Sequence, residues 1–510
     1  MADSPPGTRI AAGVASAGAA GAVVAFGVTQ LVSALVSPAS DARAAVGAAI
    51  IDLTPGSVKE WAIQTFGTAD KLFLSVMVLA VVIAVAAMAA TRERSRVPLG
   101  TVTLLVFGGA GCAAVLARPG AGLLDAVPTL VGTGCGVAVL RFLTASAPDG
   151  GTADTDTGRR RSLQTLAFLG LGTATGVGGV LTSRRLQSVA TEIETAGLPP
   201  VARPAPPIPP GVQPPLAGLP SFVTGNADFF RIDTALRVPQ LSRRDWTLRI
   251  HGMVGREITY TFDDLQRFEP VQRAITLTCV SNPIGGDLIS NAVWTGYRIR
   301  DLLRDAAIAD DADMVLSTSV DGFTVGTPVE ALTDDRDALL AIGMNGVPLP
   351  PEHGYPARLV VPGLYGFVSA TKWVVDLELT RFDRAEAYWT RLGWSAQAPI
   401  KTGSRIDVPR AGARLKAGPV TLGGVAWAQG RGIGAVEVRI DDAEWRPATL
   451  GAAYSHDTWR LWTFDWQATP GPHTITVRAT DNTGTVQTAD RSSPIPDGAT
   501  GWPSITVDVR

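Results

Sequence analysis

The sequence predicts a multi-domain protein in which a helical transmembrane region is followed by an α+β domain and a C-terminal β-sandwich. Three observations lead to this fold class. Long apolar stretches without charge are confined to residues 1–195, a proline-rich stretch follows, and the remainder reads as globular sequence that ends in short β-rich runs. A chain of 510 residues is too long for one compact domain. The net charge of −2 shows no basic excess, so we expect no nucleic-acid partner.

The transmembrane region, residues 1–195, contains about five predicted helices. Each apolar segment is close to the ~20 residues that cross a hydrocarbon core of ~30 Å. The predicted helices run from Ile10 to Leu35, Leu72 to Ala90, Val97 to Leu116, Leu123 to Leu143, and Ser162 to Thr182. Small residues favour close helix packing in lipid, and the segments contain many of them, including Gly108, Gly109, Gly111, Gly132, Gly134 and Gly136.

Basic loops predict the orientation of these helices. Arg92, Arg94 and Arg96 precede the third segment, and residues 159–161 (Arg-Arg-Arg) precede the fifth. The positive-inside rule places both loops in the cytoplasm, although Arg184–Arg185 counts against it. We therefore expect a multi-pass protein of the cytoplasmic membrane whose following domains are extracytoplasmic.

The fifth segment also resembles a twin-arginine export signal. Arg160 and Arg161 are followed by Ser-Leu-Gln and a Gly/Ala-rich apolar run. A domain that takes up a bulky cofactor in the cytoplasm must be exported already folded, and this route exports folded proteins. The alternative is an ordinary basic flank of a membrane helix.

The soluble part begins with a proline-rich stretch, residues 196–220, which predicts a semi-rigid polyproline spacer. Residues 221–395 interleave strands and helices irregularly, which predicts an α+β domain. Its strands are expected at 246–251, 274–279, 357–361 and 372–379, with helices at 262–268 and 299–306. Residues 396–510 contain short strands separated by Gly, Pro and Asp turns, which predicts a β-sandwich, with strands at 405–408, 420–427, 435–441, 459–467 and 473–480.

Cys279 is the only cysteine of the soluble part, since Cys112 and Cys135 lie in apolar segments. It ends a β-rich run and precedes the loop Val280–Gly286, so its thiol is expected at the end of a strand. A lone cysteine is most often a small buried apolar residue. An exposed thiol in an exported domain oxidises, however, whereas a thiolate bound to a transition metal is protected.

A group of cationic side chains follows in the stretch Met344–Gly363 and just beyond it. His353 and Arg358 lie on either side of a turn, and Lys372 lies near the start of the next strand. Together they could hold an anion such as a phosphate by charge-assisted hydrogen bonds. The alternative is a solvated trio with carboxylate partners.

These features are similar to the sulfite-oxidase family of molybdopterin enzymes. The resemblance covers residues 221–395, with 396–510 similar to that family's immunoglobulin-like dimerisation domain. It rests on short sequence motifs that occur in the same order as in the family: Phe229–Pro239, Leu277–Cys279, Ala292–Gly296, Asp321–Gly322, Met344–Gly363 and Lys372–Trp373.

The resemblance implies a molybdenum–molybdopterin cofactor with Cys279 as the metal ligand. It also implies that the cofactor is contacted by Phe230, Arg231, Asp321, His353, Arg358, Ser369, Ala370, Thr371 and Lys372. A substrate pocket is expected around Arg231, Trp294, Trp394 and Lys401. For Lys401 and Arg405, ion pairs between domains are the equal alternative.

The chain departs from the family pattern at Trp394, which occupies the place of an active-site tyrosine. An indole donates one hydrogen bond but cannot relay a proton as a phenol can. This difference weakens the case for sulfite as the substrate. The family's haem-binding module is also missing. No histidine lies in the membrane region, and no Cys cluster or CxxCH motif is present, so we expect neither haem nor an iron–sulfur cluster.

The leading functional prediction is oxygen-atom transfer at molybdenum, with oxidation of sulfite or a related small oxyanion. A separate electron carrier, such as a cytochrome or a quinone-linked protein, would then accept the electrons, and the enzyme is expected to form a homodimer. The first alternative is a reductase of S- or N-oxides such as methionine sulfoxide. An alternative of another class is a non-catalytic membrane-anchored receptor.

Overall fold

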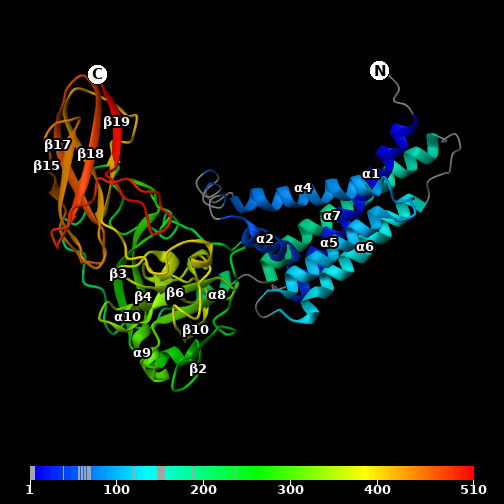
Figure 1. Cartoon of the computed structure of the whole chain (residues 1–510), viewed down its shortest axis with the longest axis horizontal. Coiled ribbons are helices and arrows are strands. Elements are labelled where there is room, and N and C mark those ends of the chain that lie inside the picture. The colour runs from blue at the N-terminus through cyan, green and yellow to red at the C-terminus, as the bar shows by residue number, and fades with distance from the viewer. Residues whose placement is uncertain are drawn as a thin grey trace. The chain divides into compact units, whose positions relative to one another are not determined.

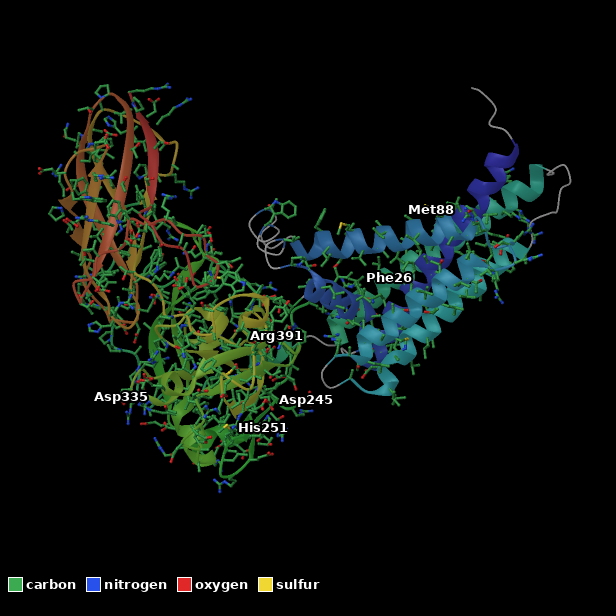
Figure 2. All side chains as sticks on the ribbon, viewed as in Figure 1. Phe26, Met88, Asp245, His251, Asp335 and Arg391 are labelled. Atoms are coloured by element: carbon green, nitrogen blue, oxygen red, sulfur yellow. The ribbon has the colours of Figure 1, made fainter. Side chains whose placement is uncertain are left out.

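The chain divides into two compact units, residues 1–188 with 234–238 and residues 189–233 with 239–510. The computed structural model describes residues 6–37, 40–55, 58, 61, 65, 70–118, 121–145, 155–186, 189–235 and 237–510. The first unit is helical and the second is rich in strands (Figure 1). Polar side-chain atoms are sparse along the helices, around Phe26 and Met88, and dense over the second unit (Figure 2).

Among the residues that the structure describes, the first unit contains five helices that are long and apolar enough to cross a membrane, which confirms the prediction. The apolar spans are Gly13–Val36, Phe73–Ala90, Leu99–Leu116, Leu123–Ala145 and Arg159–Ser183. The helices that form them are α1 (Pro6–Val36), α4 (Asp70–Ala90), α5 (Leu99–Leu116), η3 with α6 (Leu123–Ala126, Val127–Ala145) and α7 (Thr155–Leu186). A shorter helix that was not predicted, α2 (Ala42–Leu53), has 12 residues and reaches only ~18 Å at 1.5 Å per residue.

Helix α1 packs against α4, α6 and α7 through small residues. A Cβ on Gly132 would overlap the carbonyl oxygen of Ala25, and one on Gly136 would overlap that of Gly21. Gly109 and Gly134 have nothing within 4 Å of such a Cβ. Only part of the predicted small-residue set therefore brings helices together.

The proline-rich stretch is part of the second unit, which begins at residue 189 and includes helix α8 (Ala190–Thr195). Ala202 N–H donates to the carbonyl oxygen of Pro270 at 3.1 Å, and Tyr454 Oη donates to that of Pro206 at 2.7 Å. Val212 is 2% exposed. The stretch is therefore not the free spacer that its composition predicts, because its backbone and side chains are bound along the soluble unit.

The α+β part contains one mixed and one antiparallel sheet, which share the buried core around Trp246 and Tyr297. The first has the strand order β2-β1-β10-β5-β6, and the second has β3-β4-β7-β8 with β9 on β7. The strands are β1 Thr247–Gly252, β2 Ile258–Thr261, β3 Pro270–Thr278, β4 Ile289–Arg298, β5 Met314–Ser319, β6 Thr324–Pro328, β7 Leu339–Met344, β8 Val347–Pro348, β9 Arg358–Val360 and β10 Val374–Thr380. The helices are η4 Asp263–Arg267, α9 Ile299–Ala306, α10 Val329–Thr333, η5 Pro351–His353, η6 Gly366–Val368 and η7 Thr390–Leu392.

The C-terminal part is a β-sandwich of two sheets, as predicted. One sheet has the order β11-β13-β17-β16 and the other β12-β19-β18-β14-β15. The strands are β11 Gly403–Val408, β12 Arg414–Leu415, β13 Gly418–Trp427, β14 Ile433–Ile440, β15 Arg446–Pro447, β16 Thr449–Leu450, β17 Arg460–Ala468, β18 Gly471–Asp481 and β19 Ser504–Val509. Alternating side chains of both sheets form its own core, which includes Leu422, Trp462 and Val477.

Candidate active site

Cys279 lies directly after strand β3, at the start of a closed loop. Its N–H donates to the carbonyl oxygen of Leu288 at 3.0 Å, and its own carbonyl accepts from Asn282 N–H at 3.1 Å. The Asn282 side chain accepts from Leu288 N–H at 3.0 Å, which fixes both ends of the loop. The thiol is therefore held on a rigid turn at the end of a strand, as the sequence predicted.

Arg358 begins strand β9 and is almost completely buried, with 5% of its surface exposed. Its guanidinium donates to the carbonyl oxygens of His353 at 3.2 Å and Ala370 at 3.4 Å, and lies 5.1 Å from the ring centre of Trp294. No described carboxylate lies within ion-pair distance of it. Burial lowers the pKa of Arg358 to about 9, which reflects the cost of a charge without a counter-ion.

Lys372 and Arg231 share one carboxylate. Asp233 Oδ2 lies 2.8 Å from Lys372 Nζ and 2.9 Å from Arg231 Nε, and its side chain is only 4% exposed. Burial lowers the pKa of Lys372 to about 8, although the charge of Asp233 opposes this. The side chain of Arg231 is 32% exposed, so it is the accessible cation of the group.

His353 lies at the end of η5 and is neutral. Burial lowers its pKa to about 4, and Arg358 and Lys372 add to this effect, although the hydrogen bond with Asn226 opposes it. Because Nε2 lies 2.8 Å from the carbonyl oxygen of Asn226, this nitrogen must carry the proton. Nδ1 is then an acceptor, so His353 contributes polarity but no charge.

Backbone geometry brings these groups together. Gly354 has a φ of 109°, and a Cβ there would lie 3.0 Å from Arg358 Cβ and 3.2 Å from Lys372 Cα. Trp373 has a left-handed φ of 51°, uncommon for such a side chain, and its indole N–H donates to the carbonyl oxygen of Pro351 at 2.8 Å. The backbone conformations of Gly354 and Trp373 thus allow the segments that carry Arg358 and Lys372 to pack closely together.

Two segments connect this cation group to Cys279. Phe230 N–H donates to Ser290 Oγ at 3.1 Å, and Ser290 pairs with Leu277 on β3, two residues before Cys279. The neighbouring Phe229 ring lies 5.5 Å from that of His353. A Cβ on Gly366 would lie 3.8 Å from the carbonyl oxygen of Thr278. The segments 229–233 and 366–372 therefore both run from the cysteine to the cations.

The remaining predicted cofactor residues lie in or beside these segments. Asp321 lies in the turn between β5 and β6 and accepts from Phe323 N–H at 3.3 Å, and the adjacent Val320 N–H donates to the Trp373 carbonyl. Ser369 and Thr371 are fully buried, and their hydroxyls are bonded within the protein, to Tyr365 O at 2.9 Å and Ser317 Oγ at 2.6 Å. These two hydroxyls stabilise the loop, and Ala370 contributes its carbonyl to Arg358.

The two predicted pocket tryptophans have different environments. Trp294 is fully buried, and its indole N–H donates to the carbonyl oxygen of Ile275 at 3.1 Å, so it lies beneath Arg358 rather than on a pocket wall. Trp394 is 5% exposed and packs against Phe367 and Trp389. Its indole nitrogen is buried and has no hydrogen-bond partner in the part of the chain that the structure describes. An unsatisfied buried donor is costly and calls for an acceptor.

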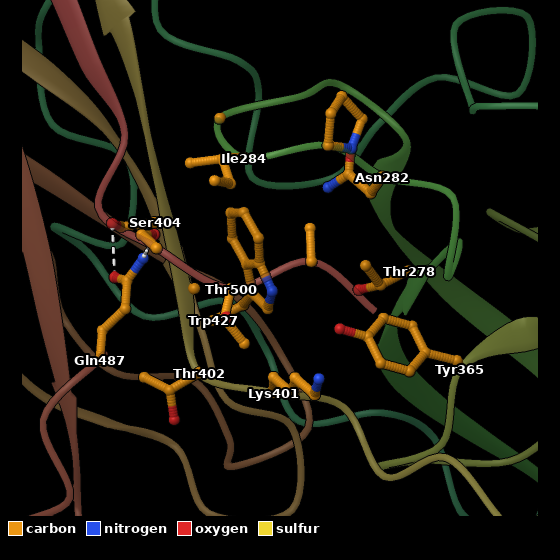
Figure 3. A pocket seen from close by; sticks show the side chains of 15 residues that line it. Thr278, Asn282, Ile284, Tyr365, Lys401, Thr402, Ser404, Trp427, Gln487 and Thr500 are labelled. Carbon is orange, nitrogen blue, oxygen red and sulfur yellow. Dashed lines mark hydrogen bonds between the residues drawn. The ribbon is translucent and has the colours of Figure 1, made fainter. Parts of the chain in front are cut away.

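Lys401 is not a free cation. Its ammonium group lies 2.8 Å from Asp497 Oδ1 and 2.8 Å from the carbonyl oxygen of Gly498, so its ion pair lies within the C-terminal domain rather than between domains. Arg405 pairs with Asp407 at 2.8 Å. Lys401 does line a cavity, together with Tyr365 and Thr278, beside the cysteine loop (Figure 3).

The cation group has a surplus of positive charge. Among the described residues, Arg231 and Lys372 pair with one carboxylate, Asp233, Arg358 pairs with none, and the low pKa of His353 favours its neutral form. Buried charges are normally paired, so this arrangement is suited to an anion with strong acceptor oxygens, such as a phosphate. No group of three or more His, Cys, Asp or Glu residues among the described residues could hold a metal ion by itself. A metal at Cys279 would therefore need most of its ligands from a cofactor.

Two contributors were missed from the sequence. Asp233 lies two residues after Arg231 in the sequence. This spacing could have indicated that its carboxylate pairs with the arginine. Tyr365 lies two residues after Gly363, just beyond the Met344–Gly363 stretch, but only the fold shows that it lines the cavity.

Comparisons with known proteins agree with this geometry. The family model described as the oxidoreductase molybdopterin binding domain matches residues 235–389, and the bacterial Ig domain model matches residues 404–477. Mouse mitochondrial sulfite oxidase is 27% identical over 323 residues, which is 54% of this chain and 58% of that protein. The uncharacterized oxidoreductase YuiH of Bacillus subtilis is 32% identical over 149 residues, 29% of this chain and 72% of that protein.

Among solved structures, the sulfane dehydrogenase SoxCD of Paracoccus pantotrophus aligns at 25% identity with a TM-score of 0.47, covering 52% of this chain and 74% of that chain. The chain spans little more than half the length of the mammalian sulfite oxidases that it matches.

Proposed function

Because the chain belongs to the sulfite-oxidase family of molybdopterin-dependent oxidoreductases, we propose that it catalyses oxygen-atom transfer and oxidises sulfite or a related small oxyanion. The observation that carries this proposal is the surplus of positive charge in the cation group, which the segments 229–233 and 366–372 connect to Cys279. The receptor alternative does not account for it, since a structural core does not keep Arg358 buried without a counter-ion.

The residues present fit the family's cofactor. Arg358 and Lys372 would hold its phosphate, with His353 and Asp321 at the edges, and Cys279 would ligate molybdenum by its thiolate. When bound, the molybdenum cofactor supplies the exchange of an oxygen atom coupled to two electrons. Arg231 keeps a third of its side chain exposed and would attract an anionic substrate. The Trp394 indole N–H would donate to an oxygen atom in the closed interior.

A steady-state assay of the full-length protein with sulfite and an artificial electron acceptor tests this function. Arg231→Gln should raise KM by about tenfold or more, since about 1.4 kcal/mol of charge-assisted binding is a factor of ten. Arg256→Gln is a matched control, because that side chain bonds only the carbonyl oxygen of Asp305 in a separate region. Absence of turnover with sulfite and related oxyanions in molybdenum-loaded protein would refute the proposed substrate class.

Reduction of an S- or N-oxide is the second candidate, and the environment of Trp394 favours it. Its unpartnered indole N–H adds a donor without charge, which suits the oxygen of a neutral oxide such as methionine sulfoxide. An assay with a reduced artificial donor and sulfoxides separates the two directions. Faster turnover with oxides than with oxyanions would select this candidate.

We further propose that the five helices lie in the cytoplasmic membrane with the catalytic unit outside, and that a separate electron carrier and a second copy of the chain are its partners. The basic residues near the start of α7 support this orientation. Replacing Arg160 and Arg161 by Lys should leave the catalytic unit inside if export uses the twin-arginine route. Normal export of that variant, judged by protease access from outside, would exclude the route.

A further inference from the structure

A cavity of about 30 Å³ lies beside the loop that carries Cys279 (Figure 3). One wall is that loop, with Thr278 and residues 282–285, and the facing wall is the start of β11 with Trp427. Tyr365 lies between the two walls. This volume suits one or two water molecules, and the surrounding polar groups can hold them.

The hydroxyl of Tyr365 points into this cavity (Figure 3). Tyr365 lines the cavity together with Lys401, and a phenol hydroxyl can both donate a hydrogen bond to water and accept one from it. The loop around it is fitted closely. Gly498 has a φ of 102°, and a Cβ there would lie 2.6 Å from the hydroxyl oxygen. Tyr365 is 4% exposed, so its position is fixed by packing.

The cavity and one ion pair lie between the hydroxyl and solvent. Thr278, Tyr365 and Lys401 line the same cavity. Lys401 Nζ donates to Asp497 Oδ1 at 2.8 Å, and the Asp497 side chain is 45% exposed. Water in the cavity would therefore complete a path from the cysteine loop to the surface.

The proposed reaction needs such a path. Oxidation of sulfite consumes one water and releases two protons, while two electrons leave for a separate acceptor, and reduction of an oxide takes up two protons and releases one water. Trp394 cannot relay these protons, because an indole only donates.

We propose that Tyr365, the cavity water and the Lys401–Asp497 pair form the water and proton path of the active site. The hydroxyl passes protons between the metal site and the cavity water, and Asp497 exchanges them with solvent. This inference rests on the proposed oxygen-atom transfer, but it holds for either direction of that reaction.

The test uses the full-length, cofactor-loaded protein with Tyr365→Phe and Asp497→Asn. Tyr454→Phe and Asp490→Asn are the matched controls, because Tyr454 bonds only the Pro206 carbonyl and the Asp490 side chain is exposed. We expect both path variants to lose about tenfold or more in kcat with KM within about twofold, and to show a larger solvent deuterium isotope effect. Molybdenum content should stay at the wild-type level.

A second readout needs no turnover. The metal site is reduced with pre-reduced methyl viologen, which delivers electrons without releasing protons, in weakly buffered solution, and a pH-indicator dye follows the coupled proton uptake by stopped flow. Uptake should slow in both path variants and stay unchanged in the controls. Asp497→Asn lies at the exposed end, so it tests the path even if Tyr365→Phe does not fold.

The outcomes separate the two proposals. Loss of substrate binding, with a raised KM and unchanged kcat, would make the cavity a substrate site and overturn the path. Wild-type kcat and proton uptake in both variants would also overturn it. A wild-type protein that binds molybdenum but transfers no oxygen atom would instead refute the proposed function.

Discussion

Replacing Arg358 by Met should have opposite effects on the cofactor-free fold and on cofactor binding. The guanidinium is 5% exposed and has no described carboxylate partner, and burial lowers its pKa to about 9. That depression corresponds to an unfavourable free energy of about 5 kcal/mol for keeping the charge buried. Against it stand three long hydrogen bonds, to the carbonyl oxygens of Leu359, His353 and Ala370, and the contact with Trp294, at about 1 kcal/mol each.

The balance predicts that cofactor-free Arg358→Met is more stable than the wild type by about 1 kcal/mol. At about 2–4 °C per kcal/mol for a domain of this size, its melting temperature should rise by about 2–4 °C. The assay is a melting curve of full-length protein from a host that makes no pterin cofactor. The same variant from a competent host should contain less than about a tenth of the wild-type cofactor, because the loss of a charged partner of a phosphate costs more than 1.4 kcal/mol.

Arg431→Met is the contrasting control. Arg431 pairs with Asp481 at 2.8 Å, and that carboxylate is 1% exposed, so its removal should destabilise the fold by about 3 kcal/mol. Destabilisation of cofactor-free Arg358→Met to the same extent would refute the reasoning, because Arg358 would then be a structural cation. Cofactor content at the wild-type level would refute it as well.

Three further predictions concern the same cation group. Asp233→Asn should destabilise the cofactor-free protein by about 3 kcal/mol, because Lys372 and Arg231 lose their shared carboxylate. A melting curve measures this as a lower melting temperature, and an unchanged melting temperature would contradict it. Burial lowers the pKa of His353 to about 4, whereas an unfolded histidine titrates near 6.5, so the unfolded state binds more protons between these values. Stability should therefore fall by up to about 3 kcal/mol as the pH drops from about 6.5 to 4, and His353→Gln should flatten this part of the melting profile. Gly354→Ala should reduce both stability and cofactor content, since its φ of 109° strains an L-residue and its Cβ would crowd Arg358 and Lys372; wild-type values for both would show that the turn can relax.

Much of the fold could be predicted from local patterns. The five membrane helices follow from uninterrupted hydropathy, and helix α9 has the bounds expected of it, because Ile299, Leu302, Leu303 and Ala306 form one buried face. The spacer predicted from the proline-rich stretch was wrong. Composition indicates a local backbone conformation, but it does not show that the stretch is bound along the soluble unit.

Most residues of the site could be predicted from the sequence, but the ion pairs between them could not. Arg358 and Lys372 are close in sequence, separated by strand β9 and the short helix η6, so their convergence could be expected. The ion pair of Lys372 with Asp233 joins residues 139 apart, and that of Lys401 with Asp497 joins residues 96 apart. No local pattern encodes such contacts, which arise only when segments distant in the sequence fold together.

The central claim, a molybdenum cofactor held by Cys279 and the cation group, is tested most directly by metal and pterin analysis of the natively produced full-length protein. The account predicts about one molybdenum and one pterin per chain, and in Cys279→Ser a retained pterin with altered absorbance of the metal site, because the phosphate-binding cations remain while the thiolate ligand is lost. Folded, membrane-inserted protein without molybdenum and pterin, from a host that loads other molybdenum enzymes, would contradict it.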